Sequence, residues 1–381
     1  MDDCCGCNAC SQACAHACIT MQPNAEGFLM PVVDRAHCVD CGLCEMVCPV
    51  KNAKPIEPKQ PQVYIGRTTE EQLLASCASG GMAYLLSAAT IEKGGVVFGV
   101  RFDDQWNAVY DYAETKEQLE LFKGSKYIDA VVGNSYMQVK QFLQSGREVL
   151  FIGTPCHVSG LNHYLRKPYN NLLTVDIMCH AVPSPLVWQT YLKSLTKELI
   201  TNVSFRSKAF GWENYAIRIE TDNHQLVHEP NDKNIYMQGF LQGLTVRTSC
   251  ANCCARGFTS GSNIMIGDYW ELSKNNPELY DDKGMSLVFA FTAKGESYLT
   301  HLPQQVLFEQ IPWEHVDTQE MHGTLFRSTR LHPNRKRFFD RLPKTRNIQK
   351  HIQLNLKISS GNPVKRTIKK VLKRLKALIV K

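Results

Sequence analysis

Two cysteine-rich stretches near the start of the chain, CCGCNACSQAC at residues 4–14 and CVDCGLCEMVCP at residues 38–49, decide the fold of the N-terminal region. Each stretch has the spacing CxxCxxCxxxC. Three closely spaced thiolates can wrap one face of a cubane 4Fe–4S cluster, and two-cluster bacterial ferredoxins use this spacing. The runs comprise Cys4, Cys7, Cys10 and Cys14, and Cys38, Cys41, Cys44 and Cys48.

The fourth ligand of each cluster is expected from the other run, because the last cysteine of each run crosses over in two-cluster ferredoxins. We therefore expect Cys48 to join Cys4, Cys7 and Cys10, and Cys14 to join Cys38, Cys41 and Cys44. Two further cysteines, Cys5 and Cys18, are surplus to this pattern. We expect them to be small packing residues.

Zinc and disulfide bonds are the alternatives for these thiols. Zinc sites typically pair CxxC units without the third cysteine and the x3 step seen here. Disulfides need an oxidising compartment, and Met1 leads directly into Asp2, Asp3 and Cys4 without an apolar secretory segment. The spacing therefore favours iron–sulfur clusters.

Length and composition predict an ordinary globular protein. A chain of 381 residues corresponds to two or three domains. Its content of 44% hydrophobic and 21% charged residues allows a sizeable core. No window approaches the roughly 20 apolar residues of a membrane span. Because ten of the 16 cysteines precede residue 50, a reducing compartment is favoured, and we expect a cytoplasmic protein.

The net charge of +7 is concentrated at the end of the chain. Residues 365–381 contain eight Lys and Arg and no acid, which leaves the rest at −1, so a nucleic-acid partner is not favoured. The apolar residues of this tail recur at helical spacing. A basic amphipathic helix of this kind can lie peripherally on an anionic inner-membrane surface, and a disordered or partner-docking tail is the alternative.

A small-residue loop, SCASGG at residues 76–81, precedes an apolar helical pattern that runs towards Gly94. Residues 96–100, VVFGV, then read as a short buried strand. A glycine-rich turn at a helix start offers free N–H groups and a positive dipole end, so it can hold a phosphate. A simple tight turn is the alternative.

The most regular pattern runs from residue 149 to residue 179. An apolar strand at 149–152 breaks at GTPC, a helix can follow at 157–166, and a second strand at 172–178 ends at Cys179. Such a unit forms a parallel strand pair with a right-handed crossover. Cys156 and Cys179 are therefore expected at the carboxyl edge of the sheet, where open α/β sheets bind ligands.

Three further cysteines occur in TSCANCC at residues 248–254. We expect a core 4Fe–4S cluster held by four thiolates from three segments, with Cys254 as the rival for the fourth ligand. A lone reactive thiol at Cys156 and an inert one at Cys179 are the alternative. The expected ligands are Cys156, Cys179, Cys250 and Cys253. Elsewhere, we expect a loop at 205–212 and strands at 216–220 and 264–270, whereas 271–345 is uninformative.

Seven short stretches, in the same order, resemble the beta subunits of coenzyme F420 hydrogenases and dehydrogenases, and together they span most of residues 65–275. They are SCASGG (76–81), KGSKY (123–127), FIGTPCH (151–157), VDIMCHAVPSP (175–185), FRSKAFGW (205–212), SCANC (249–253) and IMIGDYW (264–270). This chain carries Cys77, His157 and Ala181 where serine, glutamine and glycine are usual.

The resemblance implies an FAD-binding core that exchanges electrons between iron–sulfur clusters and a two-electron partner. That partner is the deazaflavin coenzyme in some members and a chlorophyll derivative in a plant relative, so the substrate does not follow from membership. Lys126 and His157 are the implied catalytic residues, although Lys126 read alone is equally a solvated surface lysine. The implied FAD-binding residues are Ser79, Gly80, Gly81, Ser125, Lys126, Tyr127, Gly153 and Thr154.

We therefore expect a mixed α+β or α/β fold, with a small dicluster ferredoxin-like domain and a mixed α/β flavin-binding core. The expected function is that of an iron–sulfur flavoprotein oxidoreductase with a redox-protein or low-potential electron donor and a small-molecule two-electron substrate. An electron-carrier or docking subunit without its own substrate is the main alternative, and a scaffold protein is a third. The expected segments are a ferredoxin-type domain at 1–55, a linker at 56–62, the two parts of the core at 63–145 and 146–345, and a basic tail at 346–381.

The two cysteine runs generate a first prediction. Anaerobic iron analysis of residues 1–60 should give about eight irons per chain, because two cubane sites hold four each. Stoichiometric zinc, or fewer than about four irons after reconstitution, would contradict it.

Overall fold

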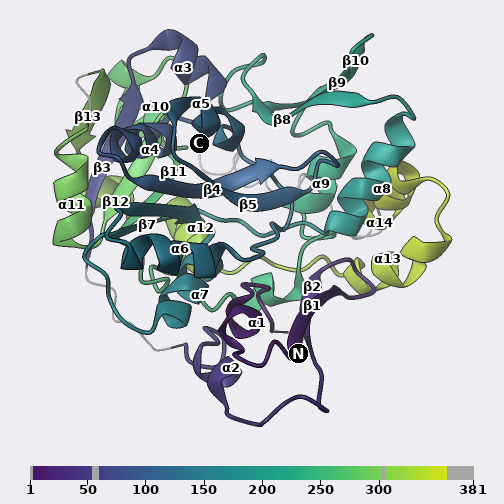
Figure 1. Cartoon of the computed structure of the whole chain (residues 1–381). Coiled ribbons are helices and arrows are strands. Elements are labelled where there is room, and N and C mark those ends of the chain that lie inside the picture. Colours follow the sequence, from purple (N-terminus) through teal and green to yellow (C-terminus); the bar gives the residue numbers. More distant parts are fainter. Residues whose placement is uncertain (1–2, 54–59, 303–304, 358–381) are drawn as a thin grey trace, which may run out of the picture.

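The computed structural model describes residues 3–53, 60–302 and 305–357, so the predicted tail helix at 365–381 lies outside the described residues. The cysteine-rich N-terminal region packs below the larger core (Figure 1). It contains an antiparallel hairpin of β1 (Ile19–Pro23) and β2 (Leu29–Val33), flanked by two short helices, α1 (Ala9–Ala13) and α2 (Leu43–Met46).

The core is built on an eight-stranded mixed sheet with the order β13-β3-β12-β11-β7-β6-β4-β5. Its four neighbouring strands β4, β6, β7 and β11 are parallel, and the flanking strands are antiparallel. The expected mixed α/β fold is therefore confirmed. The strands are β3 (Gln62–Thr68), β4 (Val96–Phe102), β5 (Ala108–Ala113), β6 (Val149–Gly153), β7 (Leu172–Ile177), β11 (Ile264–Asp268), β12 (Ser286–Ala290) and β13 (Val306–Gln310).

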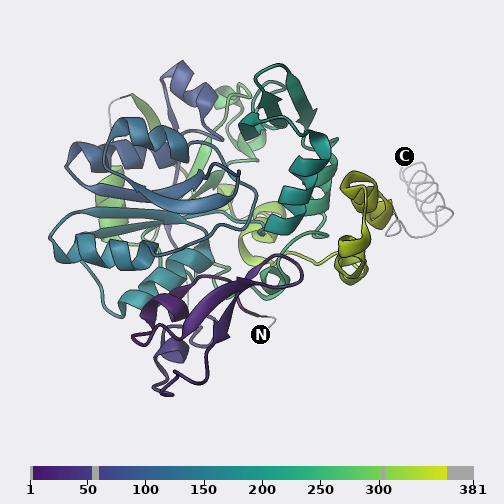
Figure 2. The same cartoon turned by 45° about the vertical axis from the view of Figure 1, so that its right-hand side comes forward.

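Helices cover both faces of this sheet (Figures 1 and 2). Alternation along β6 explains why: Val149 and Phe151 pack with residues of α6 and α7, whereas Leu150 packs with residues of α4 on the other face. The helices are α3 (Glu71–Ser76), α4 (Met82–Glu92), α5 (Lys116–Leu119), α6 (Ser135–Gln144), α7 (Pro155–Leu165), α8 (Pro185–Leu195), α9 (Ile235–Leu241), α10 (Leu272–Asn275), α11 (Ala293–Leu299), α12 (Gln319–Phe326), α13 (Arg335–Arg341) and α14 (Ile348–Lys357).

The predicted strand–helix–strand unit corresponds to β6, α7 and β7, and its two strands pair in parallel with Ile152 opposite Val175. The predicted loop at 205–212 is partly wrong. Residues 205–207 belong to β8 (Ile200–Ser207), which forms a three-stranded antiparallel sheet with β9 (Ala216–Thr221) and β10 (Gln225–Pro230). The strand forms because Val203 and Phe205, two residues apart, both pack into a buried core. The polar residues around them obscure this alternation in the sequence.

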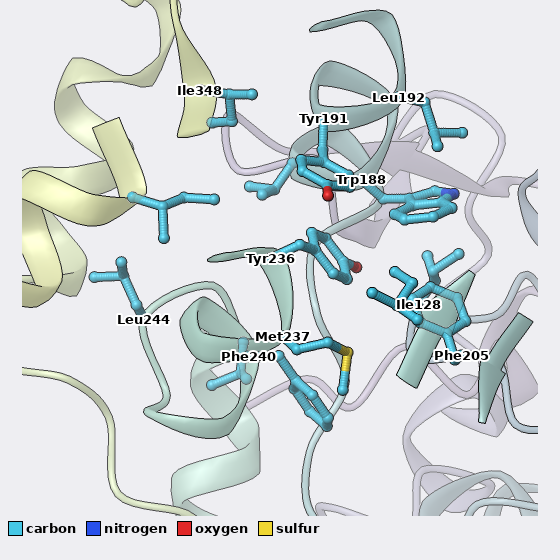
Figure 3. Packing of buried hydrophobic residues seen from close by; sticks show 14 of the residues in the cluster. Ile128, Trp188, Tyr191, Leu192, Phe205, Tyr236, Met237, Phe240, Leu244 and Ile348 are labelled. Carbon is cyan, nitrogen blue, oxygen red and sulfur yellow. The ribbon is translucent and has the colours of Figure 1, made fainter. Parts of the chain in front are cut away.

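An aromatic core joins this small sheet to α8 and α9 (Figure 3). The Trp188 ring lies with its centroid 4.9 Å from that of Phe205 and 5.0 Å from that of Tyr236. The Tyr236 hydroxyl donates a hydrogen bond of 2.9 Å to the carbonyl of Tyr127. The aromatic core therefore fixes the loop that carries Tyr127.

A buried carboxyl group on β7 anchors the loop that follows the CxxC segment. The Ser260 hydroxyl donates to Asp176 Oδ2 at 2.5 Å, and Asp176 is fully buried. Burial raises the pKa of Asp176 from 3.8 to about 7, although hydrogen bonds from Ser260 and Ser262 oppose the shift. A neutral Asp176 is therefore favoured in the folded chain below about pH 7.

This carboxyl group should make stability depend on pH. Because its folded pKa is raised, its stabilising contribution is present below the unfolded pKa and is lost as pH rises towards about 7. Asp176→Asn should remove that loss and stabilise the chain by about 2–4 kcal/mol at about pH 8. Urea unfolding between about pH 4 and about pH 8 measures the loss, with the exposed Asp222→Asn as control. A pH slope identical to that of the parent would contradict the assignment.

Candidate functional site

The two cysteine runs adopt the same backbone conformation. Gly6 (φ 74°) and Asp40 (φ 52°) occupy equivalent left-handed positions before the second cysteine of each run. Asn8 (φ 64°) and Gly42 (φ 72°) do the same directly after it. Two left-handed residues around each second cysteine turn the chain tightly, so that successive thiols can face one centre. The donor set and the backbone therefore fit two clusters of the same kind.

The first ferredoxin thiol site consists of Cys4, Cys7, Cys10 and Cys48. Burial raises the pKa of Cys4, and the neighbouring Cys7 and Cys48 thiols add to that shift. Burial also raises the pKa of Cys10 to about 12, with further contributions from Cys7, Cys4 and Cys48. The structure thus places Cys48 near Cys4 and Cys10 of the first run.

We call the predicted ligand set Cys14, Cys38, Cys41 and Cys44 the second ferredoxin thiol site. Cys14 ends α1, and its Sγ atom lies 3.3 Å from Sγ of Cys18. The hydrogen bond with Cys14 is the main reason why the pKa of Cys18 rises to about 11, and Cys38 also interacts with this thiol. Cys18 therefore lies against two members of the site, while Cys41 is exposed.

The core thiol cavity lies where α7, β7 and the segment 248–254 meet. Cys156 is in the first turn of α7, Cys179 follows β7, and a short 3-10 helix (Thr248–Asn252) carries Cys250 just before Cys253. Each pair among these four thiols interacts electrostatically. The cysteines lining this cavity are Cys5, Cys156, Cys179, Cys250, Cys253 and Cys254.

Burial dominates the protonation of three of the expected core thiols. It raises the pKa of Cys179 well above its ordinary value, that of Cys250 to about 12 and that of Cys253 to about 11. Buried thiols of this kind favour the neutral state unless a cation or metal compensates their charge. The arrangement therefore suits four thiolates that share a positively charged iron core.

Cys254 and Cys5 form a different arrangement at the same cavity. The pKa of Cys254 is lowered, chiefly by a hydrogen bond from Cys5. Cys5 has a pKa well above its ordinary value because of side-chain hydrogen bonds with Cys156, Cys254 and Cys7. Sequence reasoning placed Cys5 among packing residues, because only the three-dimensional structure brings residues 5 and 254 together.

A much larger cavity of about 630 Å³ opens at the carboxyl ends of the parallel strands, between the glycine loop and the loop at 123–127. Its volume lies within the range of small-molecule and cofactor sites. Seven of the eight expected FAD-binding residues line it: Ser79, Gly81, Ser125, Lys126, Tyr127, Gly153 and Thr154. The eighth, Gly80, lies behind the wall, where its N–H donates to Ser286 Oγ at 3.0 Å.

The glycine loop requires both of its glycines. Gly81 has φ 87° and directly precedes α4, so a left-handed residue starts the helix. A Cβ atom at Gly80 would lie 2.3 Å from the carbonyl oxygen of Gly66 on β3. The loop can therefore pack closely on the sheet and present the N-terminus of α4 to the cavity.

Both expected catalytic residues line the large cavity, where His157 is buried and Lys126 is partly buried. Nζ of Lys126 donates to the carbonyl groups of Leu121 and Lys123 at 3.1 and 2.9 Å, and burial lowers its pKa to about 7. This geometry does not fit the alternative of a freely solvated lysine. Burial lowers the pKa of His157 to about 4, and its Nδ1 lies 3.1 Å from the Tyr110 hydroxyl.

A buried ion pair between Arg206 and Asp268 closes one side of this cavity. The guanidinium group makes bonds of 2.8 and 2.9 Å with the two carboxylate oxygens. It also donates to the carbonyl of Ala78 and to the Tyr127 hydroxyl. Arg206 thereby ties β8, β11, the glycine loop and the loop at 123–127 together. The sequence motifs at 205–212 and 264–270 contained both residues, but their pairing was not predicted.

The two cavities share a wall formed by the end of β7. Cys179 and the following residues through Val182 line both the core thiol cavity and the large cavity. Within the described residues, no three His, Cys, Asp or Glu side chains gather closely enough to hold a single metal ion. None of the described helices has the length and apolar composition of a membrane span.

The cysteine runs and the mixed α/β core define an iron–sulfur protein of the electron-transferring oxidoreductase class. Residues 3–52 match the 4Fe-4S dicluster domain. Residues 146–314 match the family described as the C terminus of the coenzyme F420 hydrogenase/dehydrogenase beta subunit. The two matches together support the family of coenzyme F420 hydrogenase/dehydrogenase beta subunits, with an N-terminal 4Fe–4S dicluster domain.

Among solved structures, the chain is similar to one from the F420-reducing [NiFe] hydrogenase complex of Methanosarcina barkeri, studied by xenon derivatization. The identity is 16%, the match covers 80% of this chain and 93% of that chain, and the TM-score is 0.47. No curated protein matches the chain.

The Arg206–Asp268 pair generates a prediction for stability. Arg206→Lys should lower the free energy of unfolding by about 2–3 kcal/mol, because an ammonium group cannot reproduce the planar two-point contact and the two further hydrogen bonds. Urea unfolding of the purified chain measures the change. Arg218→Lys, which alters the half-exposed pair with Glu220, is the control and should have a much smaller effect. Equal losses for both variants would contradict the assigned role.

Proposed function

We propose that the chain is an iron–sulfur flavoprotein oxidoreductase that passes electrons between its 4Fe–4S clusters and a two-electron substrate or coenzyme, deazaflavin-like or other, by way of FAD in the large cavity. The observation that carries this proposal is the shared wall at Cys179, which borders the core thiol cavity and the large cavity alike. A bound flavin would exchange one electron with a cluster and two with a substrate.

The N-terminus of α4 and the residues around it form the anion-binding part of the proposed FAD site. Gly81, Met82 and Ala83 line the cavity at the start of this eleven-residue helix, where N–H groups and the positive dipole end favour a pyrophosphate. Ser79 and Ser125 add hydroxyl groups to the wall, although the Ser79 hydroxyl already donates to the carbonyl of Met285 at 2.9 Å.

Lys126 is the proposed proton-holding residue of the cavity. With a pKa of about 7, its ammonium form can lose a proton and its neutral amine form can gain one near neutrality. Two carbonyl groups fix Nζ and leave one further donor position for a ligand. His157 remains neutral at this pH, and its contact with Tyr110 orients the ring as a polar wall of the reaction site.

The thiol sites supply the proposed route for electrons. We assign Cys156, Cys179, Cys250 and Cys253 to a core cluster, because all pairs among these thiols interact and Cys254 instead pairs with Cys5. The first ferredoxin thiol site lies next to the core, since Cys7 packs against α7.

The second ferredoxin thiol site is the proposed point of contact with a redox-protein donor. Cys41 is exposed there, and the nearby Val39 and Met46 are 59% and 60% exposed. A partner could therefore approach this site closely, while the small-molecule substrate would use the large cavity. We place this exchange in the cytoplasm, where thiol ligands stay reduced.

Cofactor content tests the proposal. The full chain, purified and reconstituted without oxygen, should bind about one FAD and about twelve irons, because the core adds a third cubane site. Cys250→Ser should lose about four irons and retain FAD. Flavin released by denaturation and iron assayed on the same sample give both numbers.

A lysine variant sharpens this test of the cavity. Lys126→Met should weaken FAD binding by about tenfold, or about 1.4 kcal/mol, through loss of a donor facing the cofactor. The exposed Lys336→Met on α13 is the matched control and should bind FAD like the parent. A reconstituted parent chain without FAD would overturn the flavoprotein proposal and favour a pure electron carrier.

A further inference from the structure

Lys208 directly follows β8 and binds the glycine loop at residues 76–81 from behind. Its Nζ atom donates to the carbonyl groups of Leu74, Ser79 and Lys283 at 2.7, 2.9 and 2.6 Å. These groups belong to α3, to the glycine loop and to the loop before β12. An ammonium group has three donors, so all of them are used. Lys208 is not one of the described residues that line the large cavity.

The peptide between Ser79 and Gly80 is held at both of its polar atoms. Its carbonyl group accepts from Lys208, and its N–H donates to Ser286 Oγ at 3.0 Å. The next carbonyl group, that of Gly80, accepts from the N–H of Thr68 at 2.8 Å. Because a peptide is planar, it cannot rotate without breaking one of these bonds. Lys208 therefore helps to fix the loop immediately before the start of α4.

Gly284 makes room for this ammonium group. Its φ of 110° lies in the left-handed region that favours glycine. A Cβ atom there would lie 3.0 Å from Nζ of Lys208 and 3.0 Å from the carbonyl oxygen of Ser79. A side chain at this position would therefore press on both partners of the hydrogen bond that holds the loop.

The charge of Lys208 has no carboxylate partner of its own within the described residues. Its acceptors are uncharged carbonyl groups, and the two acidic residues that attract it bind other cations. Asp268 pairs with Arg206, and Asp281 pairs with Arg67. Burial lowers the pKa of Lys208 to about 8, so the side chain is mostly charged at about pH 7. Such a charge behind a loop favours an anion in front of it.

We propose that Lys208 is a positioning residue for the FAD pyrophosphate, which fixes the glycine loop from behind and adds positive charge at the start of α4 without touching the cofactor. This inference rests on the FAD site of the proposed function. The N–H groups at the start of α4 and the charge of Lys208 act on the same phosphate groups. Riboflavin has no phosphate, so its binding does not depend on Lys208.

The experiment measures the binding of FAD and of riboflavin by quenching of flavin fluorescence. It uses the full chain, reconstituted with iron and sulfide without oxygen before any flavin is added. Lys208→Met should weaken FAD binding by about tenfold and leave riboflavin binding unchanged. Lys208→Gln keeps donors for the carbonyl groups but loses the charge, so it should fold normally and also weaken FAD binding alone. Lys208→Arg, which keeps the charge, should recover part of the loss.

Lys294 on α11 provides the matched control. Its Nζ atom donates to the carbonyl groups of Tyr169 and Leu172 at 3.0 Å each, and it is not among the described residues that line the large cavity. Lys294→Met removes a similar set of hydrogen bonds, and it should bind FAD like the parent.

Three results would contradict these expectations. Equal weakening of FAD and riboflavin binding in the Lys208 variants would overturn the proposal by making Lys208 a general structural residue. Unchanged FAD binding in Lys208→Met or Lys208→Gln, with a parent that binds FAD, would overturn this inference alone. A parent chain that binds no FAD would overturn the proposed flavin site and this inference together.

Discussion

The buried ion pair between Arg247 and Asp129 holds the ferredoxin-type region on the core. Arg247 is 3% exposed, and its Nη2 and Nε atoms donate to Asp129 Oδ2 at 2.7 and 3.2 Å. The same guanidinium group reaches the carbonyl groups of Cys4 and Leu29. A buried pair offsets its desolvation cost only when such further hydrogen bonds are made. The pair therefore stabilises the chain only while the cysteine loop is docked, which fixes the two regions relative to each other.

The parallel sheet imposes the second constraint, because it delivers distant residues to one edge. β6, β7 and β11 are adjacent and parallel, so their carboxyl ends lie on the same side. Cys156 and Cys179 follow the ends of β6 and β7, and Asp268 is the last residue of β11. The first two were predictable, since a strand–helix–strand unit is local and its handedness is fixed. The grouping of the first three cysteines in each run was predictable for a similar reason. Three ligands within seven residues need only a local turn, which the left-handed residues in both runs provide.

The unpredicted features depend on contacts between residues far apart in the sequence. Arg206 and Asp268 are 62 residues apart, and Arg247 and Asp129 are 118 apart, so neither pair leaves a local pattern. Phe205 lies in a strand because it packs into the aromatic core, which local composition does not reveal. Cys5 illustrates the same limit, since it is one unremarkable thiol among ten until the docking of its loop sets it beside Cys254.

Burial differs among the thiols that these contacts bring together. Cys41 in the second ferredoxin thiol site is exposed, Cys4 and Cys10 in the first and the four core thiols are half-buried, and Cys5 and Cys7 between them are buried. Solvent exposure is one of the properties that sets cluster potential, so sites with the same ligand type need not have the same potential. Arg247 lines the core thiol cavity and lies near Cys4, so its charge would favour added electrons in a cluster held there. Differences in burial and one fixed cation could therefore give clusters with the same ligand type different electron affinities.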